Sequence, residues 1–486
     1  MKLQMGCKAC GLLSVLLPAF ILPALTGCTA VGPDYVLVEP QAPNEWHTKI
    51  EGGLTATKMK TVGTARWWTI LKDPVLDRIE DRAIKGNLDL KQARARIREA
   101  RALRGINRAN LFPVLDAGGS AGRYRTSENS GAGEENELYS AGFDAGWELD
   151  IFGGARRAIE AAQADIEAAQ ENLNDVLVSL LAEVVLNYVE VRTYQTRLTK
   201  TEENIKAQQE TYLLNSSRYQ AGIIDELAVQ QSLYNLERTR SHISTLRIGL
   251  TKTQNRLAVL LGQSPGSLRQ ELSVSRPIPT PPPMAAVGVP AETLRQRPDI
   301  RRAERNLAAQ TARIGVATAD LYPKFRLIGS IGLESMSSNN FLEWAGRTWG
   351  IGPGISWNIF HGGAIRHNIK VQTARRDQAL IDYESTVLKA LEEVENVLNA
   401  YAEEQRRMKS LRTGAAAAQR AVLLAQDQYQ AGLVDFNNVL DAQRSLLTFQ
   451  DELAQSEGAV TSNLVRLYKA LGGGWKCLEP EPATDG

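Results

Sequence analysis

Residues 155–221 form a stretch that contains neither glycine nor proline. Within it, apolar residues recur at alternating spacings of three and four positions, which is the heptad pattern of a coiled-coil seam: Ile159, Ala162, Ile166, Ala169, Leu173, Val176 and Leu180. One continuous helix of this length would span on the order of 100 Å. A helix so long needs other helices beside it, so the sequence predicts a rod of packed helices.

A second stretch, residues 364–431, repeats the first at a displacement of 210 positions. The landmarks that keep this displacement are Asp89–Ala93 with Asp299–Ala303, Leu111–Pro113 with Leu321–Pro323, Trp147 with Trp357, Tyr219–Gly222 with Tyr429–Gly432, and Leu261–Gly262 with Leu471–Gly472. One register over so many landmarks indicates an internal duplication. Because the repeat is longer than a solenoid unit, we expect two similar halves rather than an array.

The start of the chain predicts the compartment. Residues 1–27 have a lysine-bearing start and an apolar run, as in a secretory signal peptide. The signal ends at Leu25-Thr26-Gly27-Cys28, which resembles the lipobox of bacterial lipoproteins, whose cysteine is acylated. Thr29 follows, where lipoproteins kept at the inner membrane usually carry aspartate. We therefore expect a covalent lipid on Cys28 and an outer-membrane location. The alternative is a plain signal peptide beside an ordinary cysteine.

Cysteine content and charge exclude several classes of protein. Cys7 and Cys10 leave with the signal and Cys28 would be lipidated, so Cys477 alone remains for a disulfide or a metal. Loss of the two signal lysines takes Lys and Arg from 56 to 54, against 55 Asp and Glu, which disfavours nucleic acid as a partner. The histidines have no metal-ligand spacing, and nucleophile motifs and phosphate loops are missing. We expect no cofactor, no metal and no enzyme.

Two segments, 114–151 and 324–359, change to the two-residue period of a β-strand. Every odd residue from Tyr139 to Ile151 is apolar, while the even residues are small or polar. Each segment predicts a hairpin with one apolar face, and its strands of about 12 residues are long enough to cross a membrane when tilted. The alternative is a soluble sheet packed on a core. Since four strands cannot close a barrel, closure in a membrane requires several chains.

These patterns divide the chain into six segments. They are the signal peptide (1–27), a lipidated N-terminal arm (28–73), a first repeat (74–272), a Pro-rich linker (273–289), a second repeat (290–472) and a C-terminal tail (473–486). Each repeat should contain a helix, a hairpin, a long helix and a returning helix. The predicted helices are 74–110, 155–221 and 225–261 in the first repeat, and include 364–431 and 435–471 in the second.

Glycine and aspartate mark the expected turn between each long helix and its returning helix. Gly222 and Gly432 can adopt the left-handed conformation that ends a helix. Asp225 and Asp435 follow them and are typical N-cap residues. We therefore expect two tips, each formed by one such turn.

Four motifs in combination resemble the outer-membrane efflux channels of the TolC and OprM type, and in particular their NodT-like lipoprotein branch. They are the lipobox with Val31–Tyr35, the strand end Trp147–Gly153, the passage Arg295–Glu304 and the segment Leu440–Arg444. The resemblance covers nearly the whole mature chain. It implies an α+β membrane protein in which three chains share a twelve-stranded transmembrane β-barrel and a long α-helical coiled-coil tunnel across the periplasm.

The resemblance also implies a function and a gate. The homotrimer would be the passive exit duct of a tripartite efflux pump, with a periplasmic adaptor and an inner-membrane pump of the RND type as partners. Asp441 would belong to an acidic ring that narrows the tip, and Arg444 to the polar links that hold it shut. The alternative for this pair is an i, i+3 surface contact. Gln231 and Tyr234 stand at the equivalent positions of the first repeat. Asn437 departs from the apolar residue that relatives often have one turn before the ring.

Two further surfaces are expected. The tips at Ala221-Gly222 and Ala431-Gly432 would dock the adaptor, because a duct meets its partner at the end farthest from the barrel. Aromatic residues would form a girdle against outer-membrane lipid, or some would pack between strands: Tyr139, Trp147, Trp344, Trp349 and Trp357. Two other functions remain open, an exit duct for type I protein secretion and a lipid-anchored periplasmic coiled-coil scaffold. The alternating strands disfavour the scaffold.

Overall fold

The structure is a computed structural model that describes residues 30–39, 43, 45–51, 54–55, 66–131, 133–282, 285–286 and 290–475. The predicted signal peptide, the predicted lipidation site Cys28 and Cys477 lie outside the described residues. The chain forms two compact units. The sheet unit comprises the arm up to Val38, Arg96–Ala169 and Ala303–Tyr383. The helical unit comprises Glu39–Ala95, Gln170–Arg302 and the chain from Glu384 onward.

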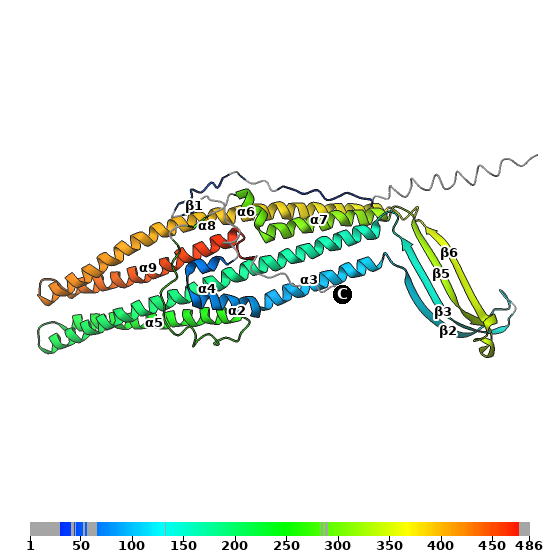
Figure 1. Cartoon of the computed structure of the whole chain (residues 1–486). Coiled ribbons are helices and arrows are strands. Elements are labelled where there is room, and N and C mark those ends of the chain that lie inside the picture. Colours follow the sequence, from blue (N-terminus) through cyan, green and yellow to red (C-terminus); the bar gives the residue numbers. More distant parts are fainter. Residues whose placement is uncertain are drawn as a thin grey trace, which may run out of the picture. The chain divides into compact units, whose positions relative to one another are not determined.

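The sheet unit contains one antiparallel sheet of four strands in the order β2-β3-β5-β6 (Figure 1). The strands are β2 (Val114–Arg125), β3 (Glu135–Leu149), β5 (Lys324–Ser335) and β6 (Arg347–Ser356). Two short 3-10 turns, η3 (Ser338–Asn340) and η4 (Trp344–Gly346), lie between β5 and β6. Strands β2 and β6 each have one neighbour, so the sheet has two open edges among the described residues.

The register gives the sheet one apolar face. Phe143, Ile331 and Trp349 lie directly opposite one another on three adjacent strands. Large apolar side chains at odd positions are exposed along this face: Leu115, Phe143, Trp147, Leu327, Ile331, Trp349, Ile351 and Ile355. The opposite face is mostly small and polar, with the exposed Val114, Tyr124 and Ile328 as exceptions, and on it Ser120 and Ser140 share a hydrogen bond of 2.8 Å. The alternation seen in the sequence is therefore an alternation between two faces of a sheet.

Both hairpins are shorter than predicted. The first was expected to continue to residue 151 and the second to residue 359, but β3 ends at Leu149 and β6 at Ser356. Tight turns explain both ends. The amide of Ile151 donates to the carbonyl of Leu149 (2.8 Å), and the amide of Ile359 donates to that of Trp357 (3.1 Å). The two-residue pattern continues through these turns because it records side-chain polarity and not backbone direction.

The principal helices match in length in pairs. They are α3 (Leu88–Ala109) and α7 (Pro298–Ala319), α4 (Gly154–Gln220) and α8 (Ala364–Gln430), and α5 (Glu226–Leu260) and α9 (Phe436–Ala470). The members of each pair have 22, 67 and 35 residues, respectively. The long helices α4 and α8 pass through both units. Within the described residues, no helix has the length and apolar character needed to span a membrane.

The expected single helix over 74–110 is wrong, because residue 87 divides it into α2 (Pro74–Gly86) and α3. The Asn87 side chain causes the break. Its amide group donates to the carbonyl of Leu260 (2.9 Å), and its Oδ1 accepts from the amide of Leu90 (3.0 Å) and so caps α3. The second half is divided in the same place, between α6 (Pro290–Gln296) and α7, where Pro298 follows Arg297.

The largest core lies in the helical unit. Here α4 is buried on most sides, with Leu177, Leu181 and Tyr188 fully covered by α2, α5 and the short 3-10 helix η2 (Trp67–Leu71). Strands β1 (Leu54–Thr55) and β4 (Ala285–Ala286) form a small parallel pair in the same unit. A helix that is apolar nearly all round must lie inside a protein, which is why the middle of α4 is its most apolar section.

One carboxyl group in this unit lies in the apolar interior. Glu80 of α2 is 0 % exposed, and neither of its side-chain oxygens has a hydrogen-bond partner in the part of the chain that the structure describes. Burial raises the pKa of Glu80 well above its ordinary value, and the nearby Asp81 and Asp77 raise it further. The folded state therefore favours the protonated, neutral form of this side chain.

We predict that Glu80→Gln raises the thermal stability of the full-length protein, and more so at pH 8 than at pH 5. The folded-state pKa of Glu80 is raised, so its contribution to stability is complete below the ordinary pKa of 4.5 and is lost as the pH rises toward the raised value. Glutamine is neutral at both pH values. Melting followed by far-UV circular dichroism measures the difference. Glu190→Gln, an exposed position on α4, is the control. Equal shifts at both pH values would contradict the prediction.

Candidate functional site

Glycine ends both long helices at the tips of the helical unit. Gly222 and Gly432 have φ values of 69° and 76°, which confirms the predicted left-handed conformation. The amide of Ile223 donates to the carbonyl of Arg218, and that of Leu433 to the carbonyl of Gln428, each at 2.9 Å. In each turn this hydrogen bond satisfies a carbonyl that the helix end leaves free. The predicted docking residues at both tips are exposed: Ala221, Gly222, Ala431 and Gly432.

The predicted caps of the returning helices differ between the two tips. The carboxylate of Asp225 accepts a hydrogen bond from the amide of Ala228 (3.2 Å) and caps α5 as expected. Asp435 has the extended backbone of an N-cap, but its side chain makes no capping hydrogen bond. Asp435 is therefore the N-cap residue of α9 by position, as expected, but its carboxylate does not make the hydrogen bond that is typical of such a residue. The backbone conformation alone does not bring that carboxylate to the free amides.

The predicted gate residues lie on the first turns of α9. Asp441 has a side chain that is 80 % exposed, and its carboxylate is 4.0 Å from the guanidinium of Arg444. Arg444 has stronger partners on α5, because it donates to the hydroxyl of Tyr234 (2.9 Å) and to Oδ1 of Asn235 (3.4 Å). The guanidinium also lies over the Tyr234 ring. The main contact of Arg444 thus joins the second tip to the first.

A second link between the tips was not predicted. Arg218, at the end of α4, donates to the last carbonyls of α8 at Tyr429 and Gln430, both at 3.4 Å, and lies over the Tyr429 ring. The Tyr429 hydroxyl donates to Oδ1 of the buried Asn215 (3.1 Å). A small apolar cluster surrounds this ring: Ala228, Phe436, Val439 and Leu440. Burial raises the pKa of Tyr429, so its hydroxyl remains a donor at neutral pH.

The repeat could have pointed to one of these links but not to the other. Tyr234 occupies the position of Arg444 in the first repeat, so the two halves place unlike residues at matching points that meet. Arg218 corresponds to Gln428, and nothing in the sequence distinguishes it from an exposed arginine in a last helical turn. Its function depends on the position of α8, which only the folded chain supplies.

In the sheet unit, two of the predicted girdle residues lie at the strand ends next to the helices. The indole N–H of Trp147 donates to the carbonyl of Leu111 (2.9 Å), and that of Trp357 donates to the carbonyl of Leu321 (3.0 Å). Each accepting residue begins a motif of the type Leu-aromatic-Pro that ends α3 or α7. The two donors are 210 positions apart in the sequence, and so are the two acceptors, so the bonds are equivalent in the two repeats. Trp147 and Trp357 therefore fasten the end of a strand to the end of a helix.

The other girdle residues lie farther along the strands. Tyr139 pairs with Ser335 near the loops, where its hydroxyl donates to Glu137 (3.1 Å). Trp349 is 74 % exposed on the edge strand β6, two residues after its start at Arg347. Trp344 lies in the turn η4, with the Arg347 guanidinium 4.3 Å from its ring centre. The aromatic residues thus lie toward the two ends of the strands, Trp147 and Trp357 at the helix end and the others toward the loops.

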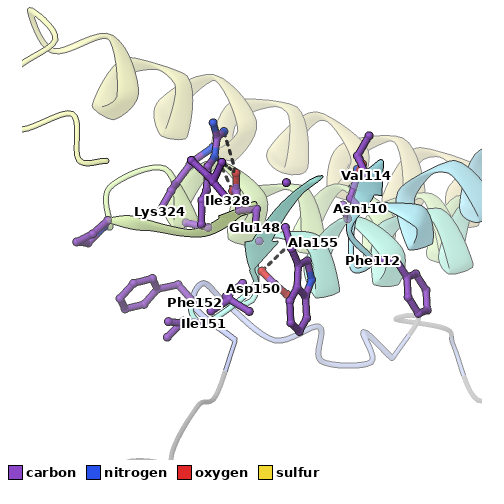
Figure 2. A pocket seen from close by; sticks show the side chains of 18 of the residues that line it. Asn110, Phe112, Val114, Glu148, Asp150, Ile151, Phe152, Ala155, Lys324 and Ile328 are labelled. Carbon is purple, nitrogen blue, oxygen red and sulfur yellow. Dashed lines mark hydrogen bonds and ion pairs between the residues drawn. The ribbon is translucent and has the colours of Figure 1, made fainter. Parts of the chain in front are cut away.

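A cavity of about 730 Å³ lies where the strands meet the helices of the sheet unit (Figure 2). Glu148 and Lys324 line it, and Arg326 donates to Glu148 at 3.0 Å. Asp150 lies at its edge, and its two oxygens accept from the amides of Ala155 and Arg156, both at 3.0 Å. Asp150 therefore caps the start of α4. Among the described residues, no group of three or more acidic, histidine or cysteine side chains is placed to hold a metal ion.

Comparisons with known proteins place the chain in a family. The sequence model of the outer membrane efflux protein family matches residues 80–263 and 289–473. Nodulation protein T of Rhizobium leguminosarum bv. trifolii is 32 % identical over 93 % of this chain and 95 % of its own length. The solvent efflux pump outer membrane protein SrpC of Pseudomonas putida is 32 % identical over 94 % of this chain and 98 % of its own.

Solved structures agree with this result. The outer-membrane channel OprN has a TM-score of 0.84 and 36 % sequence identity, and the match covers 92 % of this chain and 99 % of that channel. The two ranges matched by the family model contain all four strands of the sheet and both long helices. The chain is therefore an outer-membrane protein that belongs to the outer membrane efflux protein family, a family of channels and not of enzymes.

Proposed function

We propose that three copies of this chain form a passive exit duct, with a twelve-stranded transmembrane barrel and a coiled-coil periplasmic tunnel. The observation that carries this proposal is the open sheet, which has an exposed apolar face, a polar face and two unpaired edges. An edge strand in lipid must find a partner, because no water is available to its backbone groups. Strand β6 of one copy can meet β2 of the next. Eight strands leave an interior that side chains fill, so three copies are the fewest that enclose an open lumen.

The helices of the sheet unit support the same arrangement. In the part of α4 that belongs to this unit, Ala162 and Ile166 are buried, and in α7 Leu307 and Ile314 are buried. Arg313 of α7 bonds to Asp165 of α4 at 2.6 Å. By contrast, apolar side chains of α3 and α8 are exposed: Leu103, Ile106, Val371 and Ile381. Helices α3 and α8 thus keep exposed apolar side chains, as β2 and β6 each keep an unpaired edge among the described residues, and neighbouring copies would cover both.

The cargo and the partners follow from the relatives. Similar proteins carry names that refer to solvent efflux, toluene efflux and cation efflux. We assign to this chain small toxic compounds as cargo, a periplasmic adaptor and an inner-membrane pump of the RND type as partners, and a lipid on Cys28. The matched halves support an internal duplication. An exit duct for type I protein secretion remains the second candidate, and a scaffold without a pore is disfavoured by the exposed apolar face of the sheet.

We place the resting gate at the tips of the helical unit. Three Asp441 side chains brought together on the tunnel axis would repel one another. The links from Arg444 to Tyr234 and from Arg218 to Tyr429 hold the second tip against the first. Widening the tip breaks these contacts unless a partner replaces them. The exposed tip residues, Ala221-Gly222 and Ala431-Gly432, are where we expect the adaptor to bind.

Conductance in planar bilayers tests both the duct and its gate. We predict that the purified full-length trimer forms channels, that Arg444→Ser raises the single-channel conductance, and that Tyr234→Phe does so to a smaller extent. A half-exposed link of this kind is worth about 1 kcal/mol, or a factor of about five in the closed-to-open equilibrium. Asp441→Ala should reduce cation preference and block by multivalent cations, because its charge attracts them.

Arg412→Ser is the matched control, because it removes an ion pair between α8 and α9 and leaves the links between the tips intact. Folded trimers without channel events would favour the scaffold. If the Arg444, Tyr234 and Asp441 variants have wild-type conductance and wild-type cation block, these residues form only a surface contact. The gate then lies elsewhere.

Cysteine cross-linking tests the docking surface. In a Cys477→Ser background, Ala221→Cys and Ala431→Cys should cross-link to the adaptor, because both positions are exposed at the tips. Ile359→Cys is the control, since it is exposed beside the end of β6. If cross-links formed only from residue 359, the proposed orientation of the duct would be wrong.

A further inference from the structure

A buried arginine holds the N-terminal arm in the sheet unit. The side chain of Arg157, on the first turn of α4, is only 6 % exposed. Its guanidinium donates to three successive carbonyls of the arm, at Ala30 (3.3 Å), Val31 (3.1 Å) and Gly32 (3.4 Å). It also donates to the carboxylates of Asp34 (2.6 Å) and Glu160 (2.8 Å). Only a planar group with several N–H donors can make this set of contacts.

The backbone of the arm fits a surface that has no room for side chains. A Cβ atom on Gly32, whose φ is +93°, would lie 2.4 Å from the Cα of Gly315 in α7. A Cβ on Gly315 would in turn lie 2.8 Å from the carbonyl oxygen of Val31. At the junction of β3 and α4, a Cβ on Gly153 would lie 2.5 Å from that of Ala30. Glycine at these points permits the arm and the helices to touch backbone to backbone.

Further contacts continue along the arm. The Val31 amide donates to the carbonyl of Phe152 (3.1 Å), next to the end of β3. The hydroxyl of Tyr35 donates to Glu304 (3.2 Å), and burial together with that carboxylate raises the pKa of Tyr35 to about 12, so the hydroxyl keeps its proton. The Tyr383 hydroxyl donates to the carbonyl of Val38 (3.1 Å). The segment 30–38 is thus held by contacts at both of its ends, beginning at the strand–helix junction, while Val36 and Leu37 remain exposed.

We propose that Arg157, Gly315 and Gly153 form a receptor for the segment that follows the lipidated cysteine, and that this receptor holds the lipid anchor at the junction of sheet and helices. Ala30 is two peptide units from Cys28, which limits the distance between their Cα atoms to about 7 Å. A lipid fixed there keeps the edge of the sheet at the membrane surface and speeds barrel assembly. The proposal rests on the proposed function, because it takes Cys28 as lipidated and the sheet as membrane-inserted.

The receptor occurs once in each chain. The positions displaced by 210 from Arg157 and Gly315 are His367 and Gly105. An imidazole cannot reach three carbonyls, and a Cβ atom on Gly105 would meet no other atom within 4 Å among the described residues. The duplicated half therefore lacks the chemistry to bind a second arm. Arg157 is in this sense a positioning residue that acts on the lipid through the arm.

Assembly of the full-length protein in cells tests the proposal. Trimer formation is followed by pulse labelling and unheated gel electrophoresis for the wild type, Cys28→Ser, Arg157→Ala and Gly32→Ala. We expect Cys28→Ser to slow assembly severalfold but not to abolish it, because the barrel supplies far more apolar contact than one lipid. Arg157→Ala and Gly32→Ala should slow it by the same factor. Combining Arg157→Ala with Cys28→Ser should slow it no further.

Hydrogen exchange in detergent-solubilised trimers measures binding of the arm directly. Both Arg157→Ala and Gly32→Ala should increase exchange in residues 30–38 by about tenfold or more, without affecting α9. Gly32→Ala changes only the arm, so it remains informative if Arg157→Ala folds poorly. Arg313→Ala, which removes a different contact between α7 and α4, is the control and should leave the arm protected.

Three results would overturn the proposal. They are wild-type assembly of Arg157→Ala, additive slowing in the double variant, and wild-type assembly of Cys28→Ser. Bilayer conductance of the assembled trimers separates this outcome from a failure of the proposed duct. If the trimers conduct normally but any of these three assembly results is found, the proposed duct stands and the proposed role of the receptor is wrong.

Discussion

The structure depends on the burial of one helix that is too long to be stable alone. Helix α4 has 67 residues, and a lone helix in water has no means of covering its apolar side chains. In the helical unit, α2, α5 and η2 cover it, and in the sheet unit α7 does so through alanines that allow close packing. Because α4 passes through both units, it is a single element on which each unit builds its own core.

The sheet has the opposite problem, because its large apolar side chains remain exposed. Where the sheet meets the helices, the indoles of Trp147 and Trp357 and the carboxylate of Asp150 form hydrogen bonds with backbone groups at the helix ends. These bonds satisfy polar groups at helix ends and fix the direction in which each strand leaves. The exposed face and open edges are then properties of a single copy, and the proposed assembly in lipid would remove both.

The two halves differ at the residues to which we assign functions. Arg444 contacts Tyr234, its own counterpart in the repeat, and Arg218 contacts the end of α8. Arg157 binds the arm, whereas the equivalent residue of the second repeat is His367. A duplicated scaffold supplies two similar surfaces, and single substitutions in one copy then give each surface a separate partner. The shared positions, such as Trp147 and Trp357, maintain the fold.

The sequence by itself determined the long helices, the alternating strands and the glycine tips, because periodicity and glycine are local signals. Its four motifs in combination also resembled those of a channel family. It did not reveal the break at Asn87, whose side chain bonds to the distant Leu260, or the missing side-chain hydrogen bond of the N-cap residue Asp435. The partners of Arg444, Arg218 and Arg157 were also decided only in the folded chain. An arginine in a helix has the same local pattern whether it faces water or three carbonyls, and only the packing of distant segments distinguishes the two.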